Sequence, residues 1–152
     1  NQARVNEAAR LAKSLGLELH ARQVNAPREL PEAMEGLANS AEVLWGLSDA
    51  VVLNPQTAQS LLLFSFRNRI PFVGLSRSWV NAGALYALER DYHDIGRQCG
   101  ELAHQLLQGT PASAVPPEVP RTLIYSVNLR TARHMKVEFP EALLKGAQAV
   151  VD

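Results

Sequence analysis

The sequence predicts an α/β protein, a three-layer sandwich in which amphipathic helices cover both faces of a central parallel sheet. Two observations lead to this prediction. Short apolar runs of four to six residues alternate with segments whose apolar residues recur at three- and four-residue spacing. Strands that are apolar on both faces are typical of parallel sheets, because helices lie on both sides of such sheets.

The chain opens with a predicted helix followed by a strand. Apolar residues lie one helical turn apart at Val5, Ala8, Ala12 and Leu15. Gly16 then supplies a residue that readily adopts the left-handed conformation in which many helices end. Residues 17–24 alternate between apolar and polar side chains, which predicts an edge strand or a half-covered strand.

A second helix and the centre of the sheet are expected next. Residues 31–39 fit a helix whose apolar stripe includes Met34 and Leu37. The two apolar runs 43–47 and 50–53 follow. We expect one run to be a central strand and the other to be a loop that crosses its end.

The middle of the chain shows the clearest alternation of helix and strand. Asn54 and Pro55 suit the N-cap and the first residue of a helix that reaches Asn68. A buried strand near Val73 and another apolar run near Leu85 follow it. The sequence predicts a single helical turn between these two strands, at residues 79–81, just before Gly83.

The strongest helical pattern begins at Asp91 or Asp94, either of which suits an N-cap. Its apolar stripe consists of Ile95, Cys99, Leu102, Ala103 and Leu106. We expect this stripe to face the sheet, with Gly96 and Gly100 allowing a close approach. Cys99 is then predicted to be a buried core thiol, since free cysteine is among the most buried residue types.

A proline-rich connector marks the one expected domain boundary. Its prolines are Pro111, Pro116, Pro117 and Pro120. We expect residues 1–120 to form an α/β lobe, and residues 121–152 to form a strand and helices that pack on the lobe or on a hinge. In such folds a helix at residue 2 follows a strand, so we expect the first strand of the lobe to lie upstream. Another copy of the chain, or residues outside this sequence, would then cover the open sheet edges.

Composition excludes several classes of protein. The 152 residues are 47% hydrophobic and 20% charged, with 15 Lys and Arg against 15 Asp and Glu, which is typical of a globular domain without affinity for nucleic acid. No apolar stretch approaches the ~20 residues of a membrane span, and no signal sequence opens the chain. The single cysteine excludes an internal disulfide.

Motifs for catalysis, metal ions and cofactors are absent from the sequence. The four histidines lack metal-ligand spacing, and there is no nucleophile elbow, Walker loop or glycine-rich turn between a strand and a helix. We therefore expect a protein that is not an enzyme and that needs neither a cofactor nor a metal ion.

Polar residues follow three of the predicted strands, where ligands collect in open α/β sheets. The candidate ligand-binding residues are Ser48, Asp49, Ser76, Arg77, Ser78, Asp91 and Tyr92, with Glu89 and Arg90 beside the last two. Carboxylates suit an ammonium group, while hydroxyls and a guanidinium suit a carboxylate. Trp79 could hold an apolar body. Asp49 is the preferred single candidate, although Asp91 could serve only as a helix cap and Trp79 only as a core residue.

Several short segments, in their order and spacing, are similar to a known family. They are Ile70-Pro71-Phe72-Val73, Ala82-Gly83-Ala84-Leu85, Asp91-Tyr92, Ile95-Gly96-Arg97-Gln98, Leu107-Gln108-Gly109, Val127-Asn128-Leu129 and Thr131-Ala132. From Gly16 to its end, the chain resembles the carboxyl-terminal half of ABC transporter substrate-binding proteins, a family that includes tryptophan-binding and other amino-acid-binding members.

The resemblance implies a type I periplasmic-binding fold, in which two α/β lobes close on a small ligand without covalent chemistry. It also implies an ABC permease as partner and a periplasmic or membrane-anchored extracytoplasmic location. Amino-acid-binding members tend to carry a Thr-Asp-Asn type segment after the strand that corresponds to residues 43–45, whereas this chain has Gly46-Leu47-Ser48-Asp49 there, so only the aspartate carries over.

Three functions are therefore compared. The leading one is the solute-binding component of an importer, with an amino acid or a similar polar ligand. The second is a ligand-sensing domain of a regulator, which would need a DNA-binding helix pair upstream. The third is a small α/β enzyme using Asp49 and Asp91 as acid and base, although neither has a recognisable partner.

Overall fold

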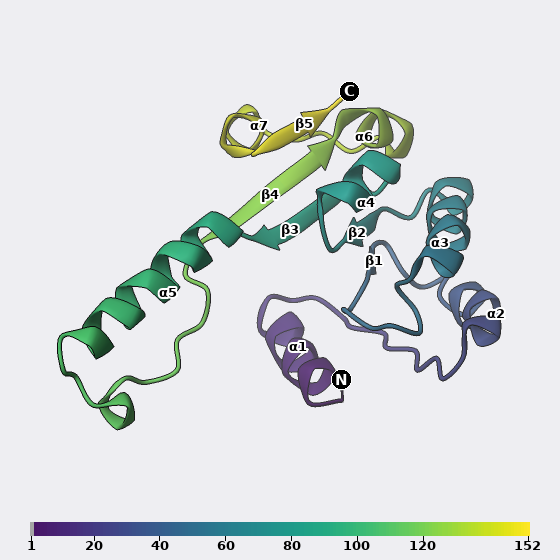
Figure 1. The fold of residues 1–152 in the computed structure, drawn as a ribbon. Coiled ribbons are helices and arrows are strands. Elements are labelled where there is room, and N and C mark those ends of the chain that lie inside the picture. The colour runs from purple at the N-terminus through teal and green to yellow at the C-terminus, as the bar shows by residue number, and fades with distance from the viewer. Residues whose placement is uncertain (1) are drawn as a thin grey trace.

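A computed structural model describes residues 2–152 and confirms the α/β class (Figure 1). Its sheet has five strands in the order β1-β2-β3-β4-β5. They are β1 (Leu44–Trp45), β2 (Phe72–Gly74), β3 (Tyr86–Arg90), β4 (Leu123–Asn128) and β5 (Ala149–Val151). Neighbouring strands are parallel except β3 and β4, which are antiparallel. The sheet is thus mostly parallel rather than wholly parallel.

Helices occupy most of the remaining chain. They are α1 (Gln2–Ser14), α2 (Leu30–Glu35), α3 (Pro55–Asn68), α4 (Arg77–Ala82), α5 (Tyr92–Leu107), α6 (Leu129–Met135) and α7 (Glu141–Gly146), with short 3-10 turns η1 (Pro27–Glu29) and η2 (Ala112–Ala114). Each helix expected from the periodicity is present, with boundaries that differ by a few residues. Gly16 has the expected left-handed conformation, with φ of 73°.

The predicted strand at residues 17–24 is wrong, because the structure has this segment as irregular chain. Leu17 is 62% exposed, and α1 before it has no buried residue. A strand needs a neighbour to satisfy its N–H and C=O groups, and among the described residues this segment has none in the sheet. The alternation of apolar and polar residues in 17–24 was therefore not enough to predict a strand, because it does not show whether a neighbouring strand is present to pair with.

The α3 helix begins where Asn54 and Pro55 predict. The Asn54 side chain accepts hydrogen bonds from the backbone N–H groups of Gln56 and Thr57, and the Thr57 hydroxyl accepts one from the Asn54 backbone. This capping box fixes the first turn at the end of the loop that follows β1. Farther along, Leu61 packs with Leu30 and Met34 of α2 in one core cluster.

The other core cluster lies under the first three strands. It consists of Leu44, Ile70, Phe72 and Ala84, with Trp79 packed against it. The rings of Trp79 and Phe72 meet edge to face at 5.5 Å between centroids. Gly74 makes this approach possible, since a Cβ there would lie 2.5 Å from the Trp79 Cβ. Trp79 therefore serves as a core residue of α4.

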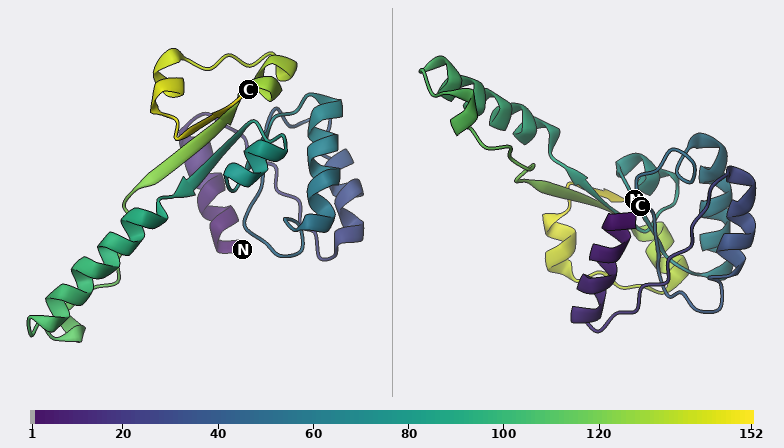
Figure 2. Two further views of the ribbon diagram at one scale, coloured as in Figure 1. Left: turned by 45° about the horizontal axis from the view of Figure 1, so that its top comes forward. Right: turned by 90° about the horizontal axis from the view of Figure 1, so that it is seen from below.

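Two paired segments carry α5 away from the sheet, as both views in Figure 2 show. Glu89 and Arg90 pair with Ile124 and Leu123, and in the described chain no third strand flanks these pairs. We call these four residues the neck. We call α5 together with residues 108–122 the arm.

The expectation that α5 packs on the sheet is wrong. Cys99 is exposed rather than buried in the core, and no atom lies within 4 Å of a Cβ built at Gly96 or Gly100. The buried residues of α5 are instead Asp94 and Gln98, which face the returning chain. The neck carries the helix beyond the edge of the sheet, so Cys99, Ala103 and Leu106 of its apolar stripe are exposed while Ile95 and Leu102 are half-buried.

Candidate functional site

The carboxyl ends of β1, β2 and β3 point to the same edge of the sheet because the three strands are parallel. Ser48 and Asp49 follow β1, and Ser76 follows β2 at the start of α4. The structure therefore places two of the three predicted loops at one edge. The third loop begins at Asp91, two residues past Glu89 and so about 7 Å farther along the neck.

Asp49 closes the turn that leads into α3. Its Oδ1 atom accepts hydrogen bonds from the backbone N–H groups of Val51 at 2.7 Å and Val52 at 3.2 Å. Asp49 is half-buried, whereas Ser48 beside it is exposed. The carboxylate thus has a structural role in the loop, and its predicted contact with a ligand stays a prediction.

The loop after β2 is held by a carboxylate from β3. Ser76 occupies the N-cap position of α4, but its hydroxyl makes no capping hydrogen bond. Instead, the Glu89 Oε2 atom accepts the backbone N–H of Arg77 at 2.6 Å. Arg77 and Ser78 are exposed, so the guanidinium and the hydroxyl are open to solvent at this edge.

A hollow of 290 Å³ lies between the start of α3 and α4. It is lined by Leu53, Asn54, Pro55, Ala58, Ser78, Trp79 and Ala82. The lining includes the candidate ligand-binding residue Ser78 and also Trp79, which supplies an aromatic wall, while Asn54 supplies an amide. Asn54 and Pro55 predicted the start of the helix, but nothing in the sequence predicted that they line a hollow.

A larger hollow of 490 Å³ lies between α2 and α3, with Met34, Leu63 and Arg67 in its wall. None of the predicted site residues lines it. It is therefore separate from the candidate site.

Asp91 and Tyr92 stand at the start of the arm. The Asp91 carboxylate accepts hydrogen bonds from the backbone N–H groups of His93 at 2.9 Å and Asp94 at 3.2 Å, so it caps α5. Tyr92 is 74% exposed. This pair lies farther along the neck than the other two predicted loops.

The chemistry available at the edge is that of polar binding. Asp49 and Glu89 offer carboxylates, and Arg77 offers a guanidinium. Within residues 2–152, no three His, Cys, Asp or Glu side chains are grouped to hold a metal ion. Every buried side-chain nitrogen or oxygen atom in the same range has a hydrogen-bond partner.

The sequence as a whole matches a protein-family model. The model for ABC transporter substrate-binding proteins covers residues 1–151. The chain belongs to this family. The resemblance predicted from short segments is thereby confirmed over residues 1–151.

Two similar solved structures have chains of about twice this length. A Streptococcus pneumoniae ABC domain in complex with L-Trp shares 21% identity and a TM-score of 0.76, and the match covers 99% of this chain and 50% of that one. A ligand-free, open substrate-binding protein with adhesive properties from Clostridium difficile shares 20% identity and a TM-score of 0.78, with the same coverage. These likenesses establish the fold, which is that of half of such a protein.

A curated relative is also similar in sequence. A tyrosine-binding protein of Clostridioides difficile is 26% identical over 105 residues, which are 69% of this chain and 30% of the relative. The chain therefore spans half or less of the length of the relatives it matches. No helix within residues 2–152 has the length and apolar character to cross a membrane.

Proposed function

We propose that this chain is one lobe of the solute-binding component of an ABC-type importer. It holds a small polar ligand of the amino-acid class in a cleft between two lobes and carries out no catalysis. The main support is the placement of the loops after β1 and β2 at one sheet edge, in a chain that the family model covers almost completely. The names of the relatives, one tyrosine-binding and one in complex with L-Trp, support the ligand class.

The chemistry of the edge fits an amino acid. An ammonium group is recognised by carboxylates such as Asp49, and a carboxylate by a guanidinium or hydroxyls such as those of Arg77 and Ser78. The hollow beside Trp79 offers a mostly apolar wall for a side chain. Asp91 and Tyr92 would join from the far side of the neck when the lobes approach one another.

The arm supports the presence of a second lobe. In α5, Leu106 is 43% exposed and Leu107 is 87% exposed. The related solved structures are about twice as long as this chain. An amphipathic helix gains stability when its apolar face is covered. We expect the other half of the protein to cover it, and the closed form to be recognised by a membrane permease in a periplasmic or otherwise extracytoplasmic location.

A ligand screen on the intact protein tests the function. Amino acids, nucleosides and small organic acids are compared by thermal shift, followed by calorimetry. A true ligand at 100 times its dissociation constant should add about 2.7 kcal/mol to the free energy of unfolding. Stabilisation by an amino acid without its turnover supports the proposal. Failure of every amino acid, or chemical conversion of the ligand, would contradict it.

The role of Asp49 is tested by two substitutions. Asp49→Asn keeps a side-chain oxygen for the N–H groups of Val51 and Val52 but removes the charge, whereas Asp49→Ala removes both. If the carboxylate binds the ligand, Asp49→Asn should lower affinity ten- to a hundredfold, or ~1.5–3 kcal/mol. Glu42→Gln, an exposed carboxyl exchange near β1, is the matched control. Unchanged affinity in Asp49→Asn would leave Asp49 as a loop cap only.

A further inference from the structure

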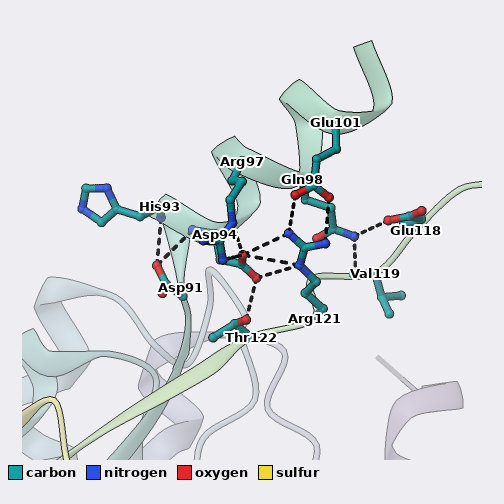
Figure 3. Close-up of polar contacts among 10 residues, drawn as sticks. All are labelled: Asp91, His93, Asp94, Arg97, Gln98, Glu101, Glu118, Val119, Arg121 and Thr122. Atoms are coloured by element: carbon teal, nitrogen blue, oxygen red, sulfur yellow. Dashed lines mark hydrogen bonds and ion pairs between the residues drawn. The ribbon is translucent and has the colours of Figure 1, made fainter. Parts of the chain in front are cut away.

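The segments that leave and re-enter the sheet are joined just beyond the neck. Asp91, at the start of the outgoing segment, donates its backbone N–H to the Thr122 carbonyl of the returning segment at 3.1 Å. From this point α5 and residues 118–122 run beside each other, linked by the side chains shown in Figure 3.

Asp94 is the centre of these links. Its carboxylate is 3% exposed, although it lies on a helix that is otherwise largely open to solvent. It accepts hydrogen bonds from the Thr122 hydroxyl at 2.5 Å and from the Arg121 guanidinium at 3.2 Å, and it forms an ion pair with Arg97. A buried carboxylate requires such partners, so its position is closely determined by both segments.

Two further contacts extend the connection along α5. The Arg121 guanidinium donates two parallel hydrogen bonds to Glu101, at 2.8 and 2.9 Å. The Gln98 amide donates to the Glu118 carboxylate at 2.6 Å and to the Val119 carbonyl at 3.1 Å. The first three turns of α5 are therefore tied to the returning segment at several heights.

The neck on the other side has few such restraints. The backbones of its two residue pairs are bonded to each other in the β3–β4 ladder and to no third strand of the described chain, and Leu123 is 56% exposed. Among its side chains, Glu89 is bonded to the sheet side of the connection, where it accepts the backbone N–H of Arg77 at 2.6 Å. Two-stranded ribbons twist more readily than strands with neighbours on both sides. The part stiffened by side-chain links, α5 with residues 118–122, therefore lies directly next to the neck, which is the part that deforms most easily.

From this contrast we propose that Asp94 is a positioning residue that makes the outgoing and returning segments one rigid body. Movement of the arm relative to the sheet is then confined to the neck. The rigidity of the arm does not depend on the proposed function. Its use does, because in a two-lobed binding protein the arm would transmit the closure of one lobe on the other.

Spin-label distances in the intact, ligand-free protein test this proposal. Labels at Gln59→Cys in α3 and Gln105→Cys in α5, in a Cys99→Ser background, report the direction of the arm. In Asp94→Asn we expect a broader distance distribution and about tenfold faster amide exchange at residues 118–122. Asp94→Glu, which keeps the charge, should restore a narrow distribution. Glu141→Gln breaks an exposed ion pair on α7 and is the matched control.

Thr122→Val provides a second variant in case Asp94→Asn fails to fold. It removes one hydroxyl donor to Asp94, keeps the side-chain shape, and should change both measurements in the same direction but less. Distance distributions and exchange rates equal to those of the parent in both variants would overturn the proposal. Because neither measurement uses a ligand, this outcome is distinguishable from failure of the proposed function.

Discussion

Single polar side chains at the starts of helices act first as local caps. Asn54, Asp91 and Asn128 each accept backbone N–H groups in the first turn of the helix that follows them. Capping depends on residues two or three positions away, so the sequence predicted the cap at Asn54 directly and limited the cap of α5 to Asp91 or Asp94. The burial of Asp94 was not predictable in this way, because its partners Arg121 and Thr122 are 27 and 28 residues distant.

The backbone at Gly74 lies too close to Trp79 for any larger residue to fit without a shift. A Cβ there would lie 2.5 Å from the Trp79 Cβ and 3.3 Å from the Ala84 Cβ. Gly74→Ala should therefore lower the free energy of unfolding by ~1–3 kcal/mol in urea denaturation. Gly96→Ala in α5 has open space around it and should be neutral or stabilising. Equal effects of the two changes would contradict this account of the core.

The charge of Asp94 predicts a difference in acid stability. Hydrogen bonds from Thr122, Arg121 and Arg97 lower the pKa of Asp94 well below its ordinary value of 3.8, although burial opposes this shift. The stability it contributes is thus present above the pKa of the unfolded chain and is lost as the pH falls below about 4. Unfolding free energies from neutral pH down to about pH 2 should decline less steeply in Asp94→Asn than in the parent. Parallel curves would show that the carboxylate is not stabilised in the fold.

Whole elements show where periodicity is informative and where it is not. The α5 helix, its cap and its apolar stripe were all predictable, since each follows from local spacing. The surface that packs against this stripe was not predictable, because the spacing of apolar residues identifies an apolar helix face but does not identify the segment that covers it. The same reason explains residues 17–24, whose alternation is real but whose neighbouring strand is absent from the described residues.

The α5 stripe predicts the reactivity of Cys99. In chain 1–152 alone the thiol is exposed and should react with an alkylating reagent without denaturant. In the intact protein, a second lobe lying on the arm should slow this reaction. Mass spectrometry after timed alkylation measures both rates. Equally fast reaction in the two forms would show that the arm is not covered at Cys99.

At the scale of the molecule, the sheet has an open side at β1. Leu44 and Gly46 donate their N–H groups to β2, so alternation along the strand turns those of Trp45 and Leu47 to the opposite side. Trp45 and Val43 are also about half exposed, at 51% and 53%. Such an edge invites pairing with a further strand. The class of fold followed from the sequence, but the antiparallel step from β3 to β4 and what completes the sheet did not.

The open edge predicts association of the isolated chain. Chain 1–152 should elute in size-exclusion chromatography above its monomer mass of 16.6 kDa, in a concentration-dependent way, whereas the proposed two-lobed protein should not. Trp45→Lys should reduce the association, because a charged side chain disfavours edge pairing. A monomeric chain 1–152 at all concentrations would contradict this prediction.

The strands β3 and β4 are antiparallel neighbours, and the arm is the segment that connects them. Asp91 and Thr122, the residues on either side of the segment 92–121, are hydrogen-bonded to each other. The strands β3 and β4 therefore form a β-hairpin whose long loop consists of α5 and the chain that returns from it. A two-residue turn commonly closes such a hairpin. The sheet should therefore tolerate replacement of residues 92–121 by a short turn, and the arm can be regarded as an insertion that its host fold does not need.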